Sequence, residues 1–156
     1  MTGNSWQIRE DDLSGAATRE LVRLHLAGMH ANSPAESVFA LDFSGLTAPD
    51  VTLWTVWRNQ TIAAMGALKT LDPYTGELKS MRTHPDFLRQ GAAALMLKHI
   101  LDVARARGMT VIYLETGRGP SFEPALALYR YRGFKESAAF GNYQPNAFSQ
   151  FLKLDL

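Results

Sequence analysis

The sequence predicts a single α/β domain over residues 1–156, built on a mixed twisted sheet of about seven strands with about four helices. The first observation behind this prediction is that 156 residues, 46% of them hydrophobic, suffice for one core of ordinary size. The second is that short runs of β-branched and aromatic residues alternate with segments of helical periodicity. In chain order these segments predict β-α-α-β-β-β-α-β-α-β-β.

The first third of the chain predicts one strand and two helices. Residues 6–9 alternate apolar and polar side chains, as a short strand does, and residues 15–30 carry apolar side chains at helical spacing. Ser33 and Pro34 form a helix start signal, so a second, short helix is expected to run to about Leu41. Residues 42–50 hold glycine, proline and serine and predict a loop.

The middle of the chain predicts three consecutive strands. Residues 51–57 are rich in β-branched and aromatic side chains, and a turn at 58–60 joins them to a strand at 61–71, so these two strands are expected to form a hairpin. A second turn, at 72–76, leads to a third strand at 77–83.

The C-terminal half of the chain alternates helices with strands. The expected elements are a helix at 88–107, a strand at 111–114, a helix at 121–132 and two closing strands at 134–140 and 148–154. Gly108 and Gly133 follow the two helices and are expected to end them. The compact apolar run at 111–114 predicts a strand in the centre of the sheet.

Composition excludes several classes of function. Lys and Arg number 16 against 15 Asp and Glu, a net charge of +1, which argues against a nucleic-acid duplex or an anionic membrane as the main partner. The absence of cysteine excludes a disulfide scaffold and a cysteine nucleophile, and the four histidines lack metal-ligand spacing. Residues 1–12 are polar, without the apolar stretch of a targeting segment, so a cytoplasmic location is expected.

The stretch from Glu77 to Phe134 carries the chemistry. In it a strand and a turn lead to the helix start Arg89, Gln90, Gly91, Ala92, Ala93 and Ala94. Small residues at a helix start let a ligand approach the free N–H groups, and the helix dipole adds positive charge, which suits a phosphate or diphosphate. The same residues also permit tight packing of the helix on the sheet, and the local pattern leaves both interpretations open. The sequence has neither a G-x-x-x-x-G-K-[ST] phosphate loop nor a G-x-G-x-x-G motif.

Two motifs lie on either side of the predicted strand at 111–114. The first is Gly91-x-Ala93, after a strand and a turn, and the second is Ala125-x-x-Leu128-Tyr129-x-x-x-Gly133-Phe134. They resemble the Q/R-x-x-G-x-G/A acyl-CoA motif and the A-x-x-L-Y-x-x-x-G-F helix of the GNAT superfamily of N-acetyltransferases. The chain looks closest to a bacterial branch of small, mostly uncharacterised acetyltransferases. It departs from the family pattern at Leu88, in place of the leading Gln or Arg, and at Phe122, in place of an asparagine.

The resemblance implies that acetyl-CoA is the cosubstrate and that no metal takes part. In the family this cosubstrate lies in a V-shaped cleft where the strands corresponding to 77–83 and 110–115 splay apart, and its pantetheine arm pairs with the edge of the first strand. An N–H group near Met81 would polarise the thioester carbonyl. The cofactor-binding residues implied are Met81, Arg82, Thr83, Arg89, Gln90, Gly91, Ala92, Ala93, Ala94, Phe122 and Tyr129.

The resemblance also nominates catalytic residues. An amine attacks only when it is neutral, so a base must accept a proton, directly or through water. Glu77 is the first candidate base, because the histone-modifying members place their glutamate at this position; Glu115 is the second and His84 the third. Tyr129 matches the family's general acid for the departing thiolate. The structural alternatives are a strand glutamate paired with Lys79 and a core tyrosine. Strand alternation predicts one shared face for Glu77, Lys79, Met81 and Thr83.

Direct acetyl transfer to a small-molecule amine in a ternary complex is the expected function. Segments 33–50 and 141–149 look long enough to close the acceptor side, which disfavours the alternative of a protein or peptide N-acetyltransferase. A non-catalytic acyl-CoA-binding regulatory domain is the other alternative. The expected lining of the acceptor side is Ser33, Glu36, Ser37, Phe39, Trp54, Tyr143 and Ser149. Carboxylates there would favour a cationic amine, whereas Arg82 would favour one that bears a carboxylate. A homodimer is a further expectation from the family.

Overall fold

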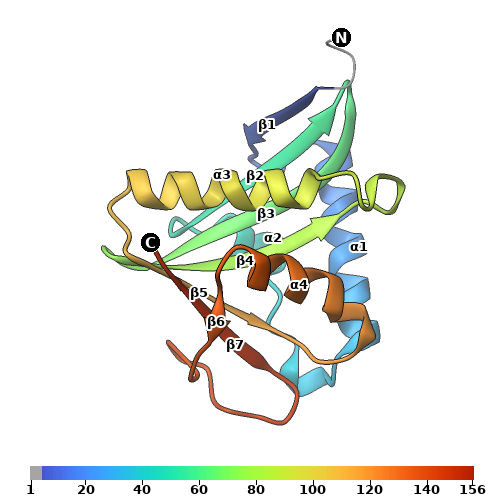
Figure 1. The fold of residues 1–156 in the computed structure, drawn as a ribbon. Coiled ribbons are helices and arrows are strands. Elements are labelled where there is room, and N and C mark those ends of the chain that lie inside the picture. Colours follow the sequence, from blue (N-terminus) through green and yellow to red (C-terminus); the bar gives the residue numbers. More distant parts are fainter. Residues whose placement is uncertain (1–4) are drawn as a thin grey trace.

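The computed structural model describes residues 5–156 and contains a seven-stranded sheet in the spatial order β1-β2-β3-β4-β5-β7-β6 (Figure 1). The strands are β1 (Trp6–Glu10), β2 (Val51–Arg58), β3 (Thr61–Asp72), β4 (Thr75–Thr83), β5 (Val111–Thr116), β6 (Lys135–Glu136) and β7 (Gln150–Asp155). Neighbouring strands run antiparallel except β4 and β5, which are parallel. The predicted α/β class with a mixed seven-stranded sheet is confirmed.

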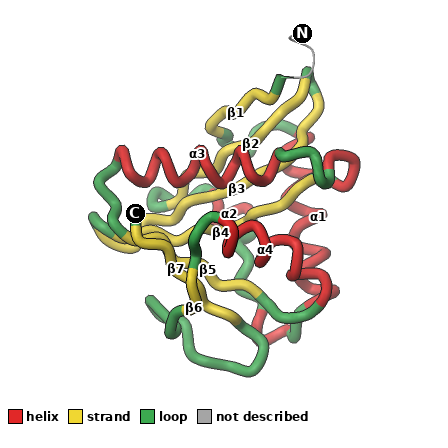
Figure 2. Tube along the Cα trace, viewed as in Figure 1, coloured by secondary structure: helices red, strands yellow, loops and turns green. Residues whose placement is uncertain are grey.

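Helices cover both faces of this sheet. They are α1 (Ala16–Asn32), α2 (Phe43–Leu46), α3 (Ala92–Ala106) and α4 (Glu123–Tyr131). Helices α3 and α4 lie in front of the sheet in Figures 1 and 2, and α1 lies behind it. The helical spacing of apolar residues in α3 produces its buried side, which consists of Ala92, Met96, Leu97, Ile100, Leu101 and Ala104.

Each face of the sheet has its own hydrophobic core. Alternation along β3 sends Leu68 to the side of α3, where it packs in the same cluster as Ile100. Alternation sends Met65 and Ala67 to the opposite side, where they pack with Leu21 of α1. The long strand β3 therefore contributes side chains to the hydrophobic cores on both faces of the sheet.

A β-bulge interrupts β4 at Ser80. The pairing of β3 with β4 shifts register between Met65 and Ala67, and Ser80 has a positive φ of 58°. One extra residue in a strand leaves its neighbours on the opposite face from the one that regular alternation gives them.

The bulge overturns the expected shared face of Glu77, Lys79, Met81 and Thr83. A Cβ added to Gly66 would lie 2.7 Å from Sδ of Met81, so Met81 lies on the α3 side of the sheet. Arg82 is paired with Met65 and contacts α1 through a hydrogen bond. Arg82, rather than Met81, therefore joins Glu77 and Lys79 on the α1 side.

The predicted second helix is wrong. Ser33 follows the last residue of α1, and Pro34, expected at the first helical position, is extended instead, with φ −57° and ψ 142°. A single 3-10 turn (Ala35–Ser37) follows. The helix lies in the predicted loop instead, as α2, where the Asp42 side chain accepts a hydrogen bond from Gly45 N at 2.9 Å.

Two further boundaries differ from the sequence prediction. Helix α3 begins at Ala92 rather than 88, because Arg89 and Gly91 have positive φ values of 61° and 91° that break the helical path. Strand β6 is much shorter than 134–140, because the chain after Ser137 leaves the sheet and packs aromatic side chains against it.

Candidate active site

A cleft between β4 and β5 is the central feature of the site. The two strands pair only over residues 75–78 and 111–114, although β4 continues to Thr83 and β5 to Thr116. They therefore diverge towards their ends, as Figure 1 shows. Beyond residue 78, the β5 side of β4 has no partner strand among residues 5–156, and an extended ligand arm can pair with such an edge.

The N-terminus of α3 lies at the end of the sheet towards which β4 and β5 diverge (Figure 1). The first hydrogen bond of the helix runs from the Leu95 N–H to the Gly91 carbonyl oxygen, at 3.0 Å. No side chain accepts a hydrogen bond from the N–H groups before Leu95. The N–H groups of Ala92, Ala93 and Ala94 therefore remain available. A Cβ added to Gly91 would meet no atom within 4 Å, so the space beside Gly91 at this end of the helix is open. This cradle fits a phosphate or diphosphate.

The two residues before Gly91 differ in whether their side chains are available to bind a ligand. Arg89 is exposed, close enough in sequence to add a full positive charge to the cradle. The Gln90 side chain is already engaged, because its Oε1 accepts from Arg58 at 2.9 Å and its Nε2 donates to the Asp86 carbonyl at 3.3 Å. The structure thus leaves Arg89, and not the Gln90 side chain, free to meet an anion.

Helix α4 carries the predicted general acid, Tyr129. The residue is 6% exposed, its ring lies 5.8 Å from that of Phe134, and burial raises the pKa of its hydroxyl. A phenol in this setting stays protonated at neutral pH and so has a proton to donate. Phe122, just before α4, packs edge-on against Phe148 with ring centroids 5.5 Å apart, so it contributes an apolar surface.

Glu77, Lys79 and Tyr143 form a closed cluster on the α1 side of β4. Oε2 of Glu77 accepts from Nζ of Lys79 at 3.1 Å and from the Tyr143 hydroxyl at 2.5 Å, and Lys79 also donates to that hydroxyl at 2.9 Å. The Glu77 and Lys79 side chains are only 4% and 10% exposed. Such burial of two charges is tolerated because each satisfies the other. The predicted pairing of Glu77 with Lys79 is present, and Tyr143 is the partner that sequence reasoning missed.

Glu115 lies on β5 near this cluster. Burial raises its pKa, the nearby Glu77 adds to that effect, and Ser149 and Lys79 oppose it. Burial also raises the pKa of Tyr143, with Glu77 and Glu115 contributing in the same direction. A carboxyl group whose pKa is displaced towards neutrality is suited to accept and release a proton.

Arg82 and His25 connect β4 to α1. Nε of Arg82 donates to Nδ1 of His25 at 3.0 Å, and Nη2 lies 3.5 Å from the His25 carbonyl oxygen. Burial lowers the pKa of His25 to about 3, helped by the charges of Arg82 and Lys79, so the ring is neutral. No sequence signal pointed to this contact, because it joins residues 57 positions apart.

The structure brings together only some of the residues predicted to line the acceptor side. Phe39 meets the Tyr143 ring edge-on at 5.1 Å, and Ser37 and Ser149 are buried. Glu36 is exposed. The prediction that Trp54 lines the acceptor side is wrong. Trp54 belongs to the core under α3, and its ring lies 5.5 Å from that of His99.

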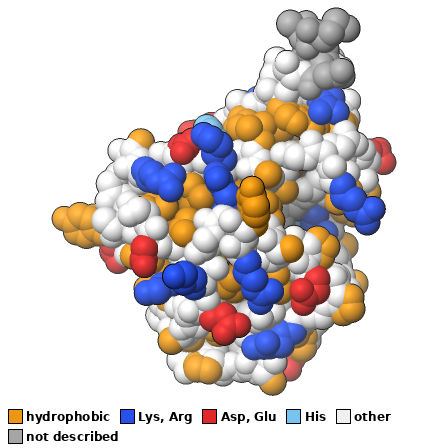
Figure 3. Space-filling model, in the orientation of Figure 1, with side chains coloured by type: hydrophobic (Ala, Val, Ile, Leu, Met, Phe, Trp, Pro, Cys, Tyr) orange, Lys and Arg blue, Asp and Glu red, His pale blue; other side chains and the backbone are white. Residues whose placement is uncertain are grey.

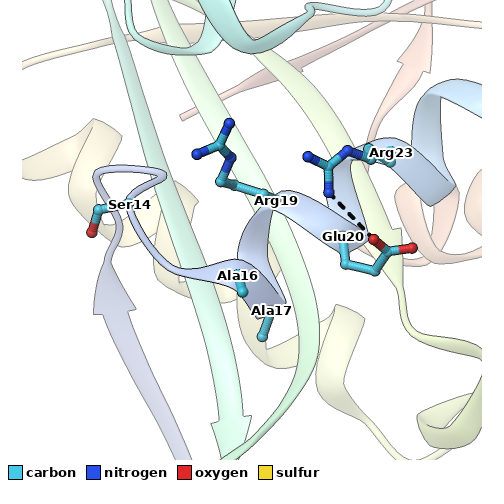
Figure 4. Close-up of a pocket in the computed structure, with 6 residues that line it drawn as sticks. All are labelled: Ser14, Ala16, Ala17, Arg19, Glu20 and Arg23. Carbon is cyan, nitrogen blue, oxygen red and sulfur yellow. Dashed lines mark hydrogen bonds and ion pairs between the residues drawn. The ribbon is translucent and has the colours of Figure 1, made fainter.

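A shallow depression of about 610 Å³ lies at the start of α1, away from the cleft (Figure 4). Its lining is Ser14, Ala16, Ala17, Arg19, Glu20 and Arg23. The ion pair between Arg23 and Glu20, at 3.3 Å, is largely exposed and indicates no chemistry. On the face of α3 and α4, basic and acidic side chains lie interspersed (Figure 3), without a single-sign field.

Within residues 5–156, no helix is both long enough and apolar enough to cross a membrane. In the same part of the chain, no group of three or more His, Asp or Glu side chains is arranged to hold a metal ion.

Comparison with known proteins agrees with this geometry. Residues 18–134 match the model of the acetyltransferase (GNAT) family. The chain is 46% identical over 149 residues to the uncharacterized N-acetyltransferase YedL of Escherichia coli, covering 96% of this chain and 94% of that protein. It is 43% identical over 145 residues to the uncharacterized N-acetyltransferase YsnE of Bacillus subtilis, covering 93% and 96%.

Solved structures share the fold at lower identity. A GNAT family acetyltransferase from Elizabethkingia anophelis with acetyl-CoA bound has a TM-score of 0.71 at 19% identity, covering 97% of this chain and 98% of that one. The ribosomal-protein-S18-alanine N-acetyltransferase from Escherichia coli has a TM-score of 0.70 at 21% identity, covering 97% and 94%.

Proposed function

The chain belongs to the acetyltransferase (GNAT) family, and from this membership we propose that it transfers an acetyl group to the amine of a small molecule by direct attack in a ternary complex. Its acyltransferase class and its use of acetyl-CoA follow from the family. In the proposed step the amine nitrogen forms a bond to the acetyl carbon and the carbon–sulfur bond breaks. The nitrogen loses one proton and the departing sulfur gains one, so the products are an N-acetyl amine and free CoA.

The divergence of β4 and β5 beside the open N-terminus of α3 is the observation that carries this proposal. Acetyl-CoA supplies the activated acetyl thioester and a diphosphate that needs an anion site. The N–H groups of Ala92 to Ala94 are available to that diphosphate, and the space in front of Gly91 leaves room for it. The unpaired edge of β4 at Met81 to Thr83 is available to hold an extended arm, with an N–H near Met81 directed at the thioester carbonyl.

Glu115 is proposed as the group that accepts the amine proton, directly or through water. Its raised pKa favours proton uptake nearer neutrality, whereas the Glu77 carboxylate is occupied by Lys79 and Tyr143. Glu77 is then proposed to organise the acceptor wall. Tyr129 is proposed to donate the proton to the departing sulfur, since its buried hydroxyl remains protonated.

The choice of a small acceptor rests on the segment 137–149. Tyr143 fixes this segment to β4 through Glu77, and its ring packs against Phe39, Phe140 and Phe151. An anchored segment beside the cleft supports a narrow acceptor site, which a folded protein surface would enter poorly. A protein acceptor is the second candidate, because the structurally similar Escherichia coli enzyme is named for acetylating alanine of ribosomal protein S18.

A thiol-release assay with acetyl-CoA tests the proposal. The panel holds amino acids, polyamines, aminoglycosides and short peptides with a free N-terminus, and calorimetry measures CoA binding separately. Turnover of a small amine at a kcat/KM at least tenfold above every peptide supports the proposal. The reverse ranking favours the protein acceptor. Binding of CoA without turnover of any amine or peptide contradicts catalysis and leaves only a binding domain.

A further inference from the structure

The chemistry around Arg82 indicates a class of acceptor. We propose that the acceptor amine carries a carboxylate, and that the Arg82 guanidinium binds this carboxylate beside the bulge of β4. This inference rests on the proposed function and narrows its substrate class to amino acids and other amines with an anionic group.

Arg82 is a half-buried cation that has no carboxylate partner within the described part of the chain. Its two hydrogen bonds run to a neutral histidine ring and to a carbonyl, both from His25. Among the ion pairs within residues 5–156, none involves Arg82. A guanidinium has five N–H donors, and these contacts use two of them. Three donors, two on Nη1 and one on Nη2, remain for an oxygen acceptor from outside the chain.

The surrounding charge reinforces this need for an anion. Lys79 also acts on His25, and the carboxylate of Glu77 is already bound by Lys79 and Tyr143. His25 stays neutral and therefore adds no charge of its own. Glu77 is paired with Lys79, and Glu115, whose pKa responds to Lys79 and Glu77, forms no ion pair with Arg82 within residues 5–156. An incoming carboxylate is therefore the direct partner that this half-buried guanidinium lacks, and such charged hydrogen bonds are strong.

The guanidinium is held in place before any ligand arrives. Nδ1 of His25 accepts from Nε and fixes the orientation of the planar group. Gly28, one turn further along α1, gives it room, because a Cβ there would lie 2.9 Å from Nη2 of Arg82. A preorganised arginine binds a carboxylate with both of its parallel N–H groups and loses little entropy in doing so.

The position of Arg82 links this charge to the reaction site. The residue follows Ser80 and Met81, where the bulge occurs and where β4 has already separated from β5. Because of the bulge, Arg82 lies on the α1 side of the sheet, with Glu77 and Lys79, while Met81 lies on the α3 side. A carboxylate held at Arg82 is therefore beside the cleft and near the proposed acceptor wall.

Matched substrates test the inference without any variant. For several amino acids that the wild type acetylates, kcat/KM is compared with that of the corresponding amino acid amide and of the decarboxylated amine. We expect the carboxylate-bearing member of each set to be preferred at least tenfold, with most of the difference in KM. Acetylation of all three members at similar kcat/KM overturns the inference and leaves the proposed function standing. No acetylation of any amine overturns the proposed function itself.

Variants then assign the preference to Arg82. Arg82→Gln is expected to reduce the preference to within twofold, and Arg82→Lys to leave an intermediate value, because it keeps the charge but loses the planar fork. Arg107→Gln is the control, since Arg107 donates to Thr52 at 3.1 Å and lies over the Trp54 ring, away from the cleft. An unchanged preference in either folded Arg82 variant means that Arg82 only tethers α1 to β4, and overturns the assignment. Thermal melting establishes that each variant is folded.

Discussion

The Tyr143 hydroxyl donates a 2.5 Å hydrogen bond to Oε2 of Glu77, although the two residues lie 66 positions apart in the chain. The bond ties the segment that follows β6 to the middle of β4. Lys79 contacts both partners, so a buried positive charge, a buried negative charge and a phenol satisfy one another. The aromatic rings of Phe39, Phe140 and Phe151 enclose the Tyr143 ring. One contact thus couples the strand at the cleft to the wall proposed for the acceptor.

Removal of this hydroxyl is expected to destabilise the fold. Tyr143→Phe keeps the ring packing but leaves a buried carboxylate with one partner fewer, which costs about 1–2 kcal/mol of unfolding free energy. Urea denaturation measures the loss. Tyr131→Phe is the control, because Tyr131 is 87% exposed and its hydroxyl loss is expected to be silent. Equal stability of both variants would show that the bond contributes nothing.

The cradle at the start of α3 predicts a selective loss of cosubstrate binding. Gly91→Glu places a bulky negative side chain in the open space before the N–H groups, so CoA affinity measured by calorimetry is expected to fall by a factor of about 100 or more. Gly108→Glu is the matched control. It also has a positive φ, 86° against 91°, and open space around its Cβ, but lies after the other end of α3. Wild-type affinity in Gly91→Glu contradicts the cradle.

Tyr129 is expected to affect chemistry more than binding. Tyr129→Phe retains the buried ring but removes the proton donor, so kcat is expected to fall by a factor of about 10–100 while KM for acetyl-CoA stays within about twofold. Steady-state kinetics separate the two effects. A parallel rise in KM with little change in kcat would assign Tyr129 a packing and binding role instead.

The two glutamates at the cleft are expected to differ in their effect on the pH–rate profile. The proposed base must be ionised, so activity should fall as the pH drops through the raised pKa of Glu115. Glu115→Gln is expected to lower kcat about 10²-fold and to remove this acid limb. Glu77→Gln is expected to keep the limb and to lower stability, because it leaves Lys79 without its counterion. Loss of the limb in Glu77→Gln alone would assign the base to Glu77.

His25 predicts that stability falls on the acid side of neutrality. Its pKa is about 3 in the folded protein against 6.5 for a free histidine, so below pH 6.5 the unfolded state binds a proton that the folded state does not. Stability should therefore decrease as the pH falls from 6.5 towards 3, with about 1.4 kcal/mol per pH unit from this group.

His25→Gln is expected to remove this contribution of about 1.4 kcal/mol per pH unit from the pH dependence of the unfolding free energy. Urea titrations at pH 6, 5 and 4 measure that dependence. His30→Gln is the control, because it removes an exposed histidine from the same helix. An equal slope in wild type and His25→Gln would show that His25 is not held neutral by Arg82 and its burial.

The sequence by itself determined most of the elements and the class of sheet. The strand predicted at 51–57 and the helical spacing in α3 follow from the local order of apolar and polar residues, and both segments are present in the structure. The uncapped helix start proposed to hold the diphosphate was also predicted in the sequence, because Gly91 and the alanines after it would act through their own backbone. The second helix was not, since Pro34 is extended rather than helical and the helix forms instead after Asp42, whose side chain caps it.

Only the tertiary structure decided which side chains meet at the cleft. The bulge at Ser80 reversed the alternation of β4 and turned Arg82 towards His25 of α1. It is set by how β4 pairs with β3, and no local pattern records that pairing. The contact of Tyr143 with Glu77 likewise joins two segments that lie 66 positions apart in the sequence. Backbone preferences act over a few positions, whereas the partners of a buried charge are chosen by the packing of distant segments.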